Sequence, residues 1–209
     1  TSGMVETWKL GLVSQLNQDI RLRGTWSYDI RAPNLAELFN EGLTEQGSPI
    51  DPRTGQAVVS YITQGGNLDL KPEKSVTISG GVVLTPRWFP GLQMSVDWYS
   101  INVKGYITTP SLNTESALCR AGNQFYCSQF HYDANGVLQT IIQFPQNAGY
   151  LKTSGIDFQA NYTMDFLSGA LSWNLLGNYT DAEVQSAFDA PPYDFAGQVG
   201  GSSSGYSGM

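Results

Sequence analysis

Six segments of this chain alternate apolar and polar residues, and the connections between them are alternately short and long. The short connections are turns around Leu16–Gln18, Thr85–Gly91 and Leu167–Gly169. The long ones run roughly from Ile30 to Lys74, from Gly105 to Gly149, and onward from Asp181. In an up-and-down antiparallel sheet, odd-numbered and even-numbered connections lie at opposite rims. The sequence therefore predicts an all-β meander with one trimmed rim and one elaborate rim.

Each of the six segments places its apolar residues on a single face, as a strand with one apolar side does. Polar residues such as Arg21, Arg23 and Thr25 occupy the other face. The fourth segment loses this phase at Ile101 and Val103, which predicts a bulge or a strand end there. The apolar faces comprise Trp8, Leu10 and Leu12; Ile20, Leu22, Trp26 and Tyr28; Val76, Ile78, Val82 and Leu84; Leu92, Met94, Val96 and Trp98; Ile156, Phe158, Ala160, Tyr162 and Met164; and Leu171, Trp173, Leu175 and Tyr179.

The lengths of the loops and strands favour a transmembrane β-barrel over a soluble sheet. Loops longer than about 15 residues are unusual in compact soluble domains, and strands of more than about ten residues suit a tilted membrane crossing. Outer-membrane barrels combine short periplasmic turns with long extracellular loops. Two alternatives remain at this point: a passive porin-type channel, and a soluble β-sandwich binding domain with one wet face.

The charge composition separates the chain from several functional classes. Charged residues make up 14% of the sequence, against about 25% in ordinary soluble domains. A net charge of −7 predicts no nucleic-acid partner, because such proteins need a cationic surface. No run approaches the roughly 18 apolar residues of a membrane-spanning helix. The first residues, Thr1–Glu6, do not form a signal peptide, so an exported protein would carry its targeting signal upstream.

The two cysteines, Cys119 and Cys127, lie close together in a polar segment. This placement favours a disulfide in an oxidising compartment, with two free thiols as the alternative. His131 is the single histidine, so no histidine-based metal site is expected, and it is interpreted as a solvated loop residue. The carboxylates lie on separate strands without a nucleophile motif or a phosphate loop, so we expect neither an enzyme nor a cofactor.

Four stretches resemble the barrels of TonB-dependent outer-membrane receptors, and they occur in the order found in that family. They run over about Trp8 to Tyr179, and the resemblance is closest to proteobacterial receptors with a paired-cysteine extracellular loop, here Cys119 and Cys127. The four stretches are Asp29–Phe39, where a strand leaves the membrane; Gly66–Ser75, of the form Asn-x-x-Leu-Lys-Pro-Glu-x-Ser; Gly91–Ile107, with Ser-Val-Asp before an aromatic pair; and Asn147–Asp157, ending in Gly-Ile-Asp.

The resemblance implies that residues 1–209 are part of a receptor barrel of about 22 strands whose lumen holds a plug. The plug domain would lie upstream, and the chain stops at Gly200–Met209 in loop-like sequence without a closing strand. The implied location is the outer membrane of a Gram-negative bacterium. The implied partners are outer-membrane lipid, a small-molecule nutrient and, through the missing plug, the TonB energy-transducing complex. Iron siderophores, cobalamin-like molecules, carbohydrates and peptides all fit as the nutrient.

Four charged residues on the polar faces are candidates for the lumen wall: Arg21, Arg23, Asp97 and Asp157. They could contact the plug or an anionic substrate. The alternative is that water and neighbouring charges simply keep them away from lipid.

Overall fold

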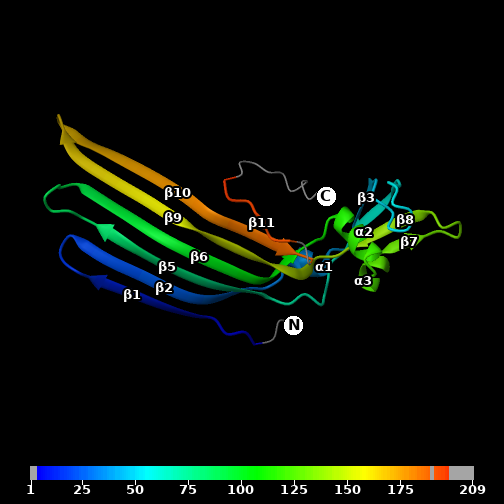
Figure 1. Ribbon diagram of the computed structural model, residues 1–209. Helices are drawn as coiled ribbons and strands as arrows, with labels where there is room; N and C mark the ends of the chain where they lie inside the picture. Colours follow the sequence, from blue (N-terminus) through cyan, green and yellow to red (C-terminus); the bar gives the residue numbers. More distant parts are fainter. Residues whose placement is uncertain (1–3, 189–190, 198–209) are drawn as a thin grey trace.

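The computed structural model describes residues 4–188 and 191–197, and its main feature is a meander of six long antiparallel strands (Figure 1). Each long strand pairs with the next one along the chain, and the short β11 (Tyr193–Asp194) adds to the end of the last. The six-strand prediction is therefore confirmed. The long strands are β1 (Trp8–Gln15), β2 (Ile20–Arg31), β5 (Glu73–Leu84), β6 (Leu92–Thr108), β9 (Gln146–Phe166) and β10 (Gly169–Ala187).

The register places all the predicted apolar residues on one face of this sheet. Val82 lies opposite Val96, and Val96 lies opposite Phe158, so apolar side chains form continuous rows across the strands. Large side chains on this face are open, with Trp173 63% exposed. From Leu171 to Tyr179 the apolar stretch of β10 would span roughly 20 Å across a membrane, for a rise of about 3.3 Å per residue and a tilt of about 45°. This height suits an outward-facing lipid band.

Two strands continue beyond the predicted limits. The sequence suggested a bulge or a strand end at Ile101 and Val103, but β6 pairs regularly through both residues. The irregularity comes later, on either side of Tyr106, next to Gly105 with a φ of +66°. The change of phase at Ile101 instead marks where the apolar face ends: beyond Trp98, that face of β6, which we call the outward face, carries Ser100, Asn102 and Lys104. β10 likewise extends past Asp181 to Ala187, whereas the predicted loop-like end at 200–209 lies outside the described residues.

The two long connections, which we call the cap (residues 32–72 and 109–145), fold together at one end of the long strands (Figure 1). Four short strands form a second sheet in the order β3-β4-β8-β7, in which β4 and β8 are parallel. Within the described residues, no helix has the length and apolarity to cross a membrane. The cap contains β3 (Leu43–Gly47), β4 (Ser60–Gln64), β7 (Phe130–Tyr132), β8 (Leu138–Gln143), α1 (Leu35–Phe39), α2 (Leu112–Arg120) and α3 (Gln124–Cys127).

A compact apolar core holds the cap together. Ile141 of β8 is fully buried, and Leu138 and Phe130 pack with it. Ile62 of β4 lies opposite Ile141 and is also buried, so both connections contribute to the interior. The sequence predicts loops for both connections, whereas the structure shows them to be one folded unit.

Candidate functional site

The polar face of the main sheet carries an ion pair that crosses an intervening strand. Arg23 of β2 lies opposite Gly81 of β5, which lies opposite Asp97 of β6. The Arg23 guanidinium reaches over the glycine and donates two hydrogen bonds to the Asp97 carboxylate, one of them 2.6 Å from Nε to Oδ1. A Cβ at Gly81 would lie 2.0 Å from Asp97 Oδ1. The missing side chain therefore makes this cross-strand contact possible.

A second carboxylate stands directly beside this pair. Asp157 of β9 is the cross-strand partner of Asp97, and like charges in that position repel each other. The Asn178 amide donates to Asp157 Oδ1 at 2.7 Å, and Tyr99 lies over Gly155 on the same face. Arg23 offsets the repulsion by neutralising Asp97. Arg23, Asp97, Asp157 and Asn178 line an open hollow of about 510 Å³.

The structure thus brings together three of the four charged residues that the sequence singled out. Arg21 lies two residues before Arg23 on the same face, but its Nε donates to Gln15 Oε1 at 3.1 Å and it does not line the hollow. Asn178 and Tyr99 also belong to the cluster and were missed. Their positions could be found only once the register of β6, β9 and β10 was known.

Gly81→Ala is expected to destabilise the main sheet by about 1–3 kcal/mol, because the new methyl group would collide with Asp97 and separate it from Arg23. Gly80→Ala is the matched control, since a Cβ there meets nothing within 4 Å, and its effect should stay within about 0.5 kcal/mol. Denaturant unfolding of the two variants and of the unsubstituted protein would measure both effects. Equal losses for the two variants would contradict this account of Gly81.

A buried carboxylate fixes the base of the cap to the main sheet. Glu73, at the start of β5, accepts hydrogen bonds from Arg31 Nε at 2.7 Å and Arg31 Nη2 at 2.6 Å. It also accepts the backbone N–H of Ile107 at 2.8 Å. Arg31 in turn contacts Glu37 of α1 at 3.2 Å. We call Arg31, Glu37, Glu73 and Ile107 the clamp, because they join β2, β5, β6 and the first turn of the cap.

Two asparagines extend the clamp to the second connection. Asn67 Nδ2 donates to the Pro145 carbonyl at 2.8 Å. Asn147 accepts from the Lys71 N–H and donates to the Lys71 and Gly105 carbonyls, all at 2.8 Å. The four stretches that carry the family resemblance therefore meet in one place. No local sequence signal predicts this convergence, because the partners are as far as 78 residues apart.

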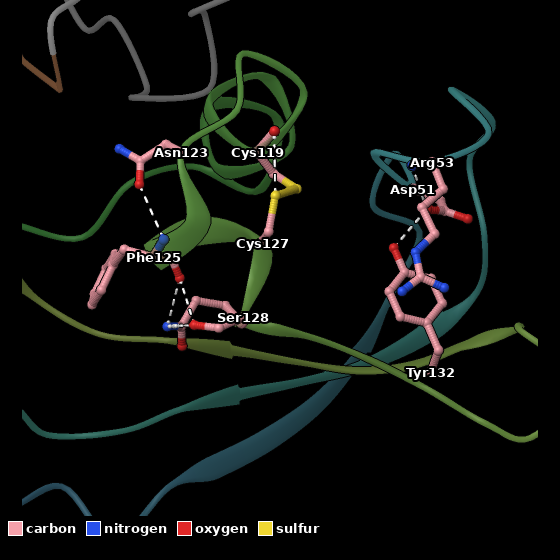
Figure 2. Close-up of a disulfide and its surroundings, with 9 residues drawn as sticks. Asp51, Arg53, Cys119, Asn123, Phe125, Cys127, Ser128 and Tyr132 are labelled. Carbon is pink, nitrogen blue, oxygen red and sulfur yellow. Dashed lines mark hydrogen bonds between the residues drawn. A yellow bond between two sulfur atoms is a disulfide. The ribbon is translucent and has the colours of Figure 1, made fainter.

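The predicted disulfide is present in the cap. Cys119 of α2 and Cys127 of α3 are bonded with an S–S distance of 2.05 Å (Figure 2). Asn123 caps α3 by accepting the Phe125 N–H at 3.1 Å. The disulfide thus closes a compact turn between two short helices. Cys119 also packs against the apolar core of the cap.

A group of polar contacts joins the first connection of the cap to the second (Figure 2). The Tyr132 hydroxyl of β7 donates to Asp51 Oδ1 at 2.8 Å, and the Arg53 guanidinium lies 3.6 Å from the Tyr132 ring centroid. Asp51 and Arg53 come from the first connection, whereas Tyr132 comes from the second. Burial, with the Asp51 hydrogen bond, raises the pKa of Tyr132 to about 12. The phenol therefore remains a hydrogen-bond donor at neutral pH.

Glu115 of α2 is almost completely buried, and its Oε2 has no hydrogen-bond partner. Burial raises the pKa of this carboxyl to about 8, and a hydrogen bond from Gln143 opposes the shift only in part. Glu115 is therefore protonated at neutral pH, because the interior of the cap disfavours its charged form. No sequence signal predicts a buried acid in this polar segment.

The cap is expected to lose stability as pH rises from about 4.5 to about 8. Within that window the folded cap holds a proton on Glu115 that the unfolded cap releases, so the slope approaches about 1.4 kcal/mol per pH unit. Glu115→Gln should flatten the dependence, whereas the exposed Glu41→Gln should leave it unchanged. Hydrogen exchange of cap amides at several pH values would measure this. A slope that survives in Glu115→Gln would assign the pH dependence to another group.

His131 lies on β7 with its side chain exposed. The described residues contain no group of three or more His, Cys, Asp and Glu side chains that could hold a metal ion. The described chain thus consists of the main six-strand sheet, which we call the wall, and of the cap at one end of it. The wall has a polar hollow on one of its faces.

Comparison with known proteins agrees with this architecture. The family model described as "TonB dependent receptor-like, beta-barrel" matches residues 1–206. The siderophore receptor PirA from Acinetobacter baumannii shares the fold at a TM-score of 0.56 and 18% identity, over 87% of this chain and 24% of PirA. A variant of the ferric enterobactin receptor PfeA from Pseudomonas aeruginosa, in complex with enterobactin, gives 0.59 and 18%, over 88% of this chain and 26% of PfeA.

PirA from Pseudomonas aeruginosa gives a TM-score of 0.55 at 19% identity, over 87% of this chain and 28% of that protein. The chain therefore spans about a quarter of the length of the solved structures that it resembles. A search of curated proteins finds no match. At these identities the solved structures establish the fold.

Proposed function

Because the chain belongs to the TonB-dependent receptor-like β-barrel family of the outer membrane, we propose that it forms part of a receptor that captures a scarce nutrient and imports it with energy from the TonB complex. The observation that carries the proposal is the family match over residues 1–206, on a sheet with one apolar and one polar face. The proposed role is binding and transport, without a catalytic step.

We propose an iron siderophore as the first substrate to test. PirA is named a siderophore receptor and PfeA a ferric enterobactin receptor, and both share the fold of this chain. Cobalamin-like molecules, carbohydrates and peptides follow as further candidates. The substrate belongs to the whole receptor, of which this chain supplies one arc of wall and two folded connections.

In this proposal the polar face of the main sheet lines the lumen. Arg21, Arg23, Asp97 and Asp157 would then face a plug domain encoded outside residues 1–209. The apolar face would contact lipid, in agreement with its exposed Trp173 and Leu175. The cap would lie on the extracellular side, because the long connections of outer-membrane barrels lie there. Its folded surface would take part in substrate capture.

Uptake of radioactive iron by cells that lack the gene tests the proposal. Cells complemented with the full-length receptor should accumulate iron from its siderophore, and a protonophore that discharges the inner membrane should abolish uptake. Uptake that persists in discharged cells would indicate a passive porin-type channel instead. Unchanged uptake in the deletion strain for every siderophore tested would move the substrate to another class.

A further inference from the structure

Three lysines lie together on the outward face of the wall, at the end of the apolar band that is nearer the cap. Lys74 of β5 is the direct cross-strand partner of Lys104 of β6. Lys104 lies opposite Tyr150 of β9, and Lys152 follows two residues later on the same face. All three lysines are exposed. We call Lys74, Lys104 and Lys152 the outer lysine cluster.

The register shows that these lysines point outward and away from the polar hollow. Lys74 is two residues from Val76 and four from Ile78, which belong to the apolar face. The Lys152 Nζ atom lies 5.2 Å from the Tyr150 ring centroid, so these two side chains share one face. Asp97 and Asp157 lie at odd-numbered positions of β6 and β9, whereas Lys104 and Lys152 lie at even-numbered ones. The cluster and the hollow are therefore on opposite sides of the sheet.

The three lysines of the cluster form no ion pair within the described part of the chain. Like charges directly opposite each other on paired strands destabilise a sheet, as Lys74 and Lys104 do here. The ion pairs of the described residues all involve arginine: Arg23, Arg31 and Arg87. The residues directly opposite the lysines are otherwise uncharged: Ile30 lies opposite Lys74, Tyr150 opposite Lys104, and Asn102 and Val184 opposite Lys152. The acidic residue Asp194 lies one strand further on, opposite Val184, and its Oδ1 accepts the backbone N–H groups of Glu183 and Ala196. An external anion would relieve the repulsion.

The surroundings of the cluster point to the kind of anion. Trp8 and Trp26 form an edge-to-face pair with centroids 4.7 Å apart, and Trp8 stacks on Tyr28 at 6.5 Å. Tyr28 pairs with Val76, one step along the outward face from Lys74. Aromatic girdles of this kind lie at the headgroup level of a bilayer. The lysines thus lie where apolar lipid chains give way to charged headgroups.

We propose that the outer lysine cluster binds the phosphate groups of an anionic amphiphile in the outer leaflet of the membrane, while the aromatic and apolar side chains below it contact the acyl chains. Each lysine side chain near a membrane surface raises the affinity for anionic headgroups about fivefold. Lys74 and Lys104 together should then contribute about 25-fold, and all three lysines on the order of a hundredfold. The site is independent of the transported nutrient.

The test uses the full-length receptor in a non-ionic detergent and native mass spectrometry of retained lipid. The probes are lipid A with its phosphates, the same glycolipid after dephosphorylation, and inorganic phosphate as a competitor. The variant Lys74→Gln with Lys104→Gln should retain phosphorylated lipid A about 25-fold more weakly. The matched control, Lys9→Gln with Arg120→Gln, removes two exposed positive charges elsewhere and should retain it normally.

Three outcomes would overturn the site. Equal loss in the control pair would show a general charge effect. Equal retention of the dephosphorylated glycolipid would show apolar adhesion without phosphate recognition. Displacement of lipid A by millimolar inorganic phosphate would show a simple anion site. Iron uptake that continues in the lysine variant would leave the proposed transport role intact, so failure of the two proposals can be told apart.

Discussion

Glu73→Ala is expected to weaken the attachment of the cap to the wall by about 2–4 kcal/mol. The substitution removes both hydrogen bonds to Arg31 and leaves the Ile107 N–H without its acceptor. An unsatisfied buried donor costs about 1–3 kcal/mol, and loss of one partner of a buried ion pair adds to this. Arg31 is 46% exposed and can return to water, which keeps the total moderate. Hydrogen exchange of the full receptor should show faster exchange at Ile107 and Thr108.

Two further variants separate the loss of the Ile107 acceptor from the loss of the ion pair with Arg31. Glu73→Gln keeps an oxygen acceptor for the Ile107 N–H but loses the charge that pairs with Arg31, so its loss should be about half as large. Glu45→Ala is the control, because the carboxylate of this exposed glutamate accepts a long hydrogen bond from Gln64, at 3.4 Å, and lies outside the clamp. Exchange at Ile107 that is unaffected by Glu73→Ala would mean that the clamp does not fix the base of the cap.

Ile141→Ala is expected to destabilise the cap by about 2–5 kcal/mol, because it removes a fully buried side chain from the centre of a small core. Ile141 belongs to the second connection, yet it lies opposite Ile62 of the first. The loss should therefore reach both connections. Amides of β3 and β4 should exchange faster together with those of β7 and β8, while the middle of the wall strands should remain protected.

Ile142→Ala provides the matched control, since this neighbouring isoleucine points to the opposite face of β8 and is only half-buried. Its effect should be clearly smaller. Faster exchange confined to β7 and β8 in the Ile141 variant would show that the two connections are stable separately, against the picture of a single cap.

The wall was predictable from the sequence because its signals are local. Alternation such as Leu171, Trp173 and Leu175 fixes which face of a strand is apolar, and short turns such as Leu167–Gly169 fix which strands pair. The Thr85–Gly91 turn also places Gly81 opposite Asp97. The register of Arg23 against Gly81, however, spans the long first connection and does not follow from a local signal. The assignment of Cys119 and Cys127 to a disulfide likewise needed only their spacing and polar surroundings.

The cap could not be predicted in the same way, because its contacts are distant in sequence. Tyr61 pairs with Thr140, and Arg31 with Glu73 across 42 positions. Some local signals were nevertheless present. Asn34 and Glu37 form a capping box that predicts the start of α1. Asn135-Gly136 is a hairpin-turn signal between β7 and β8. Neither signal, however, indicates that β4 and β8 lie side by side.

The parallel pairing of β4 with β8 has a consequence for the order in which the protein can assemble. Parallel neighbours require a crossover between them, and here that crossover contains the whole β5–β6 hairpin of the wall. The β3–β4 hairpin is synthesised first, and the edge of β4 stays unpaired until β8 has been synthesised. Completion of the surface unit is thus tied to completion of the wall beneath it. A chain with a misplaced β5–β6 hairpin could not bring β8 next to β4, so the four-stranded sheet of the cap would not form.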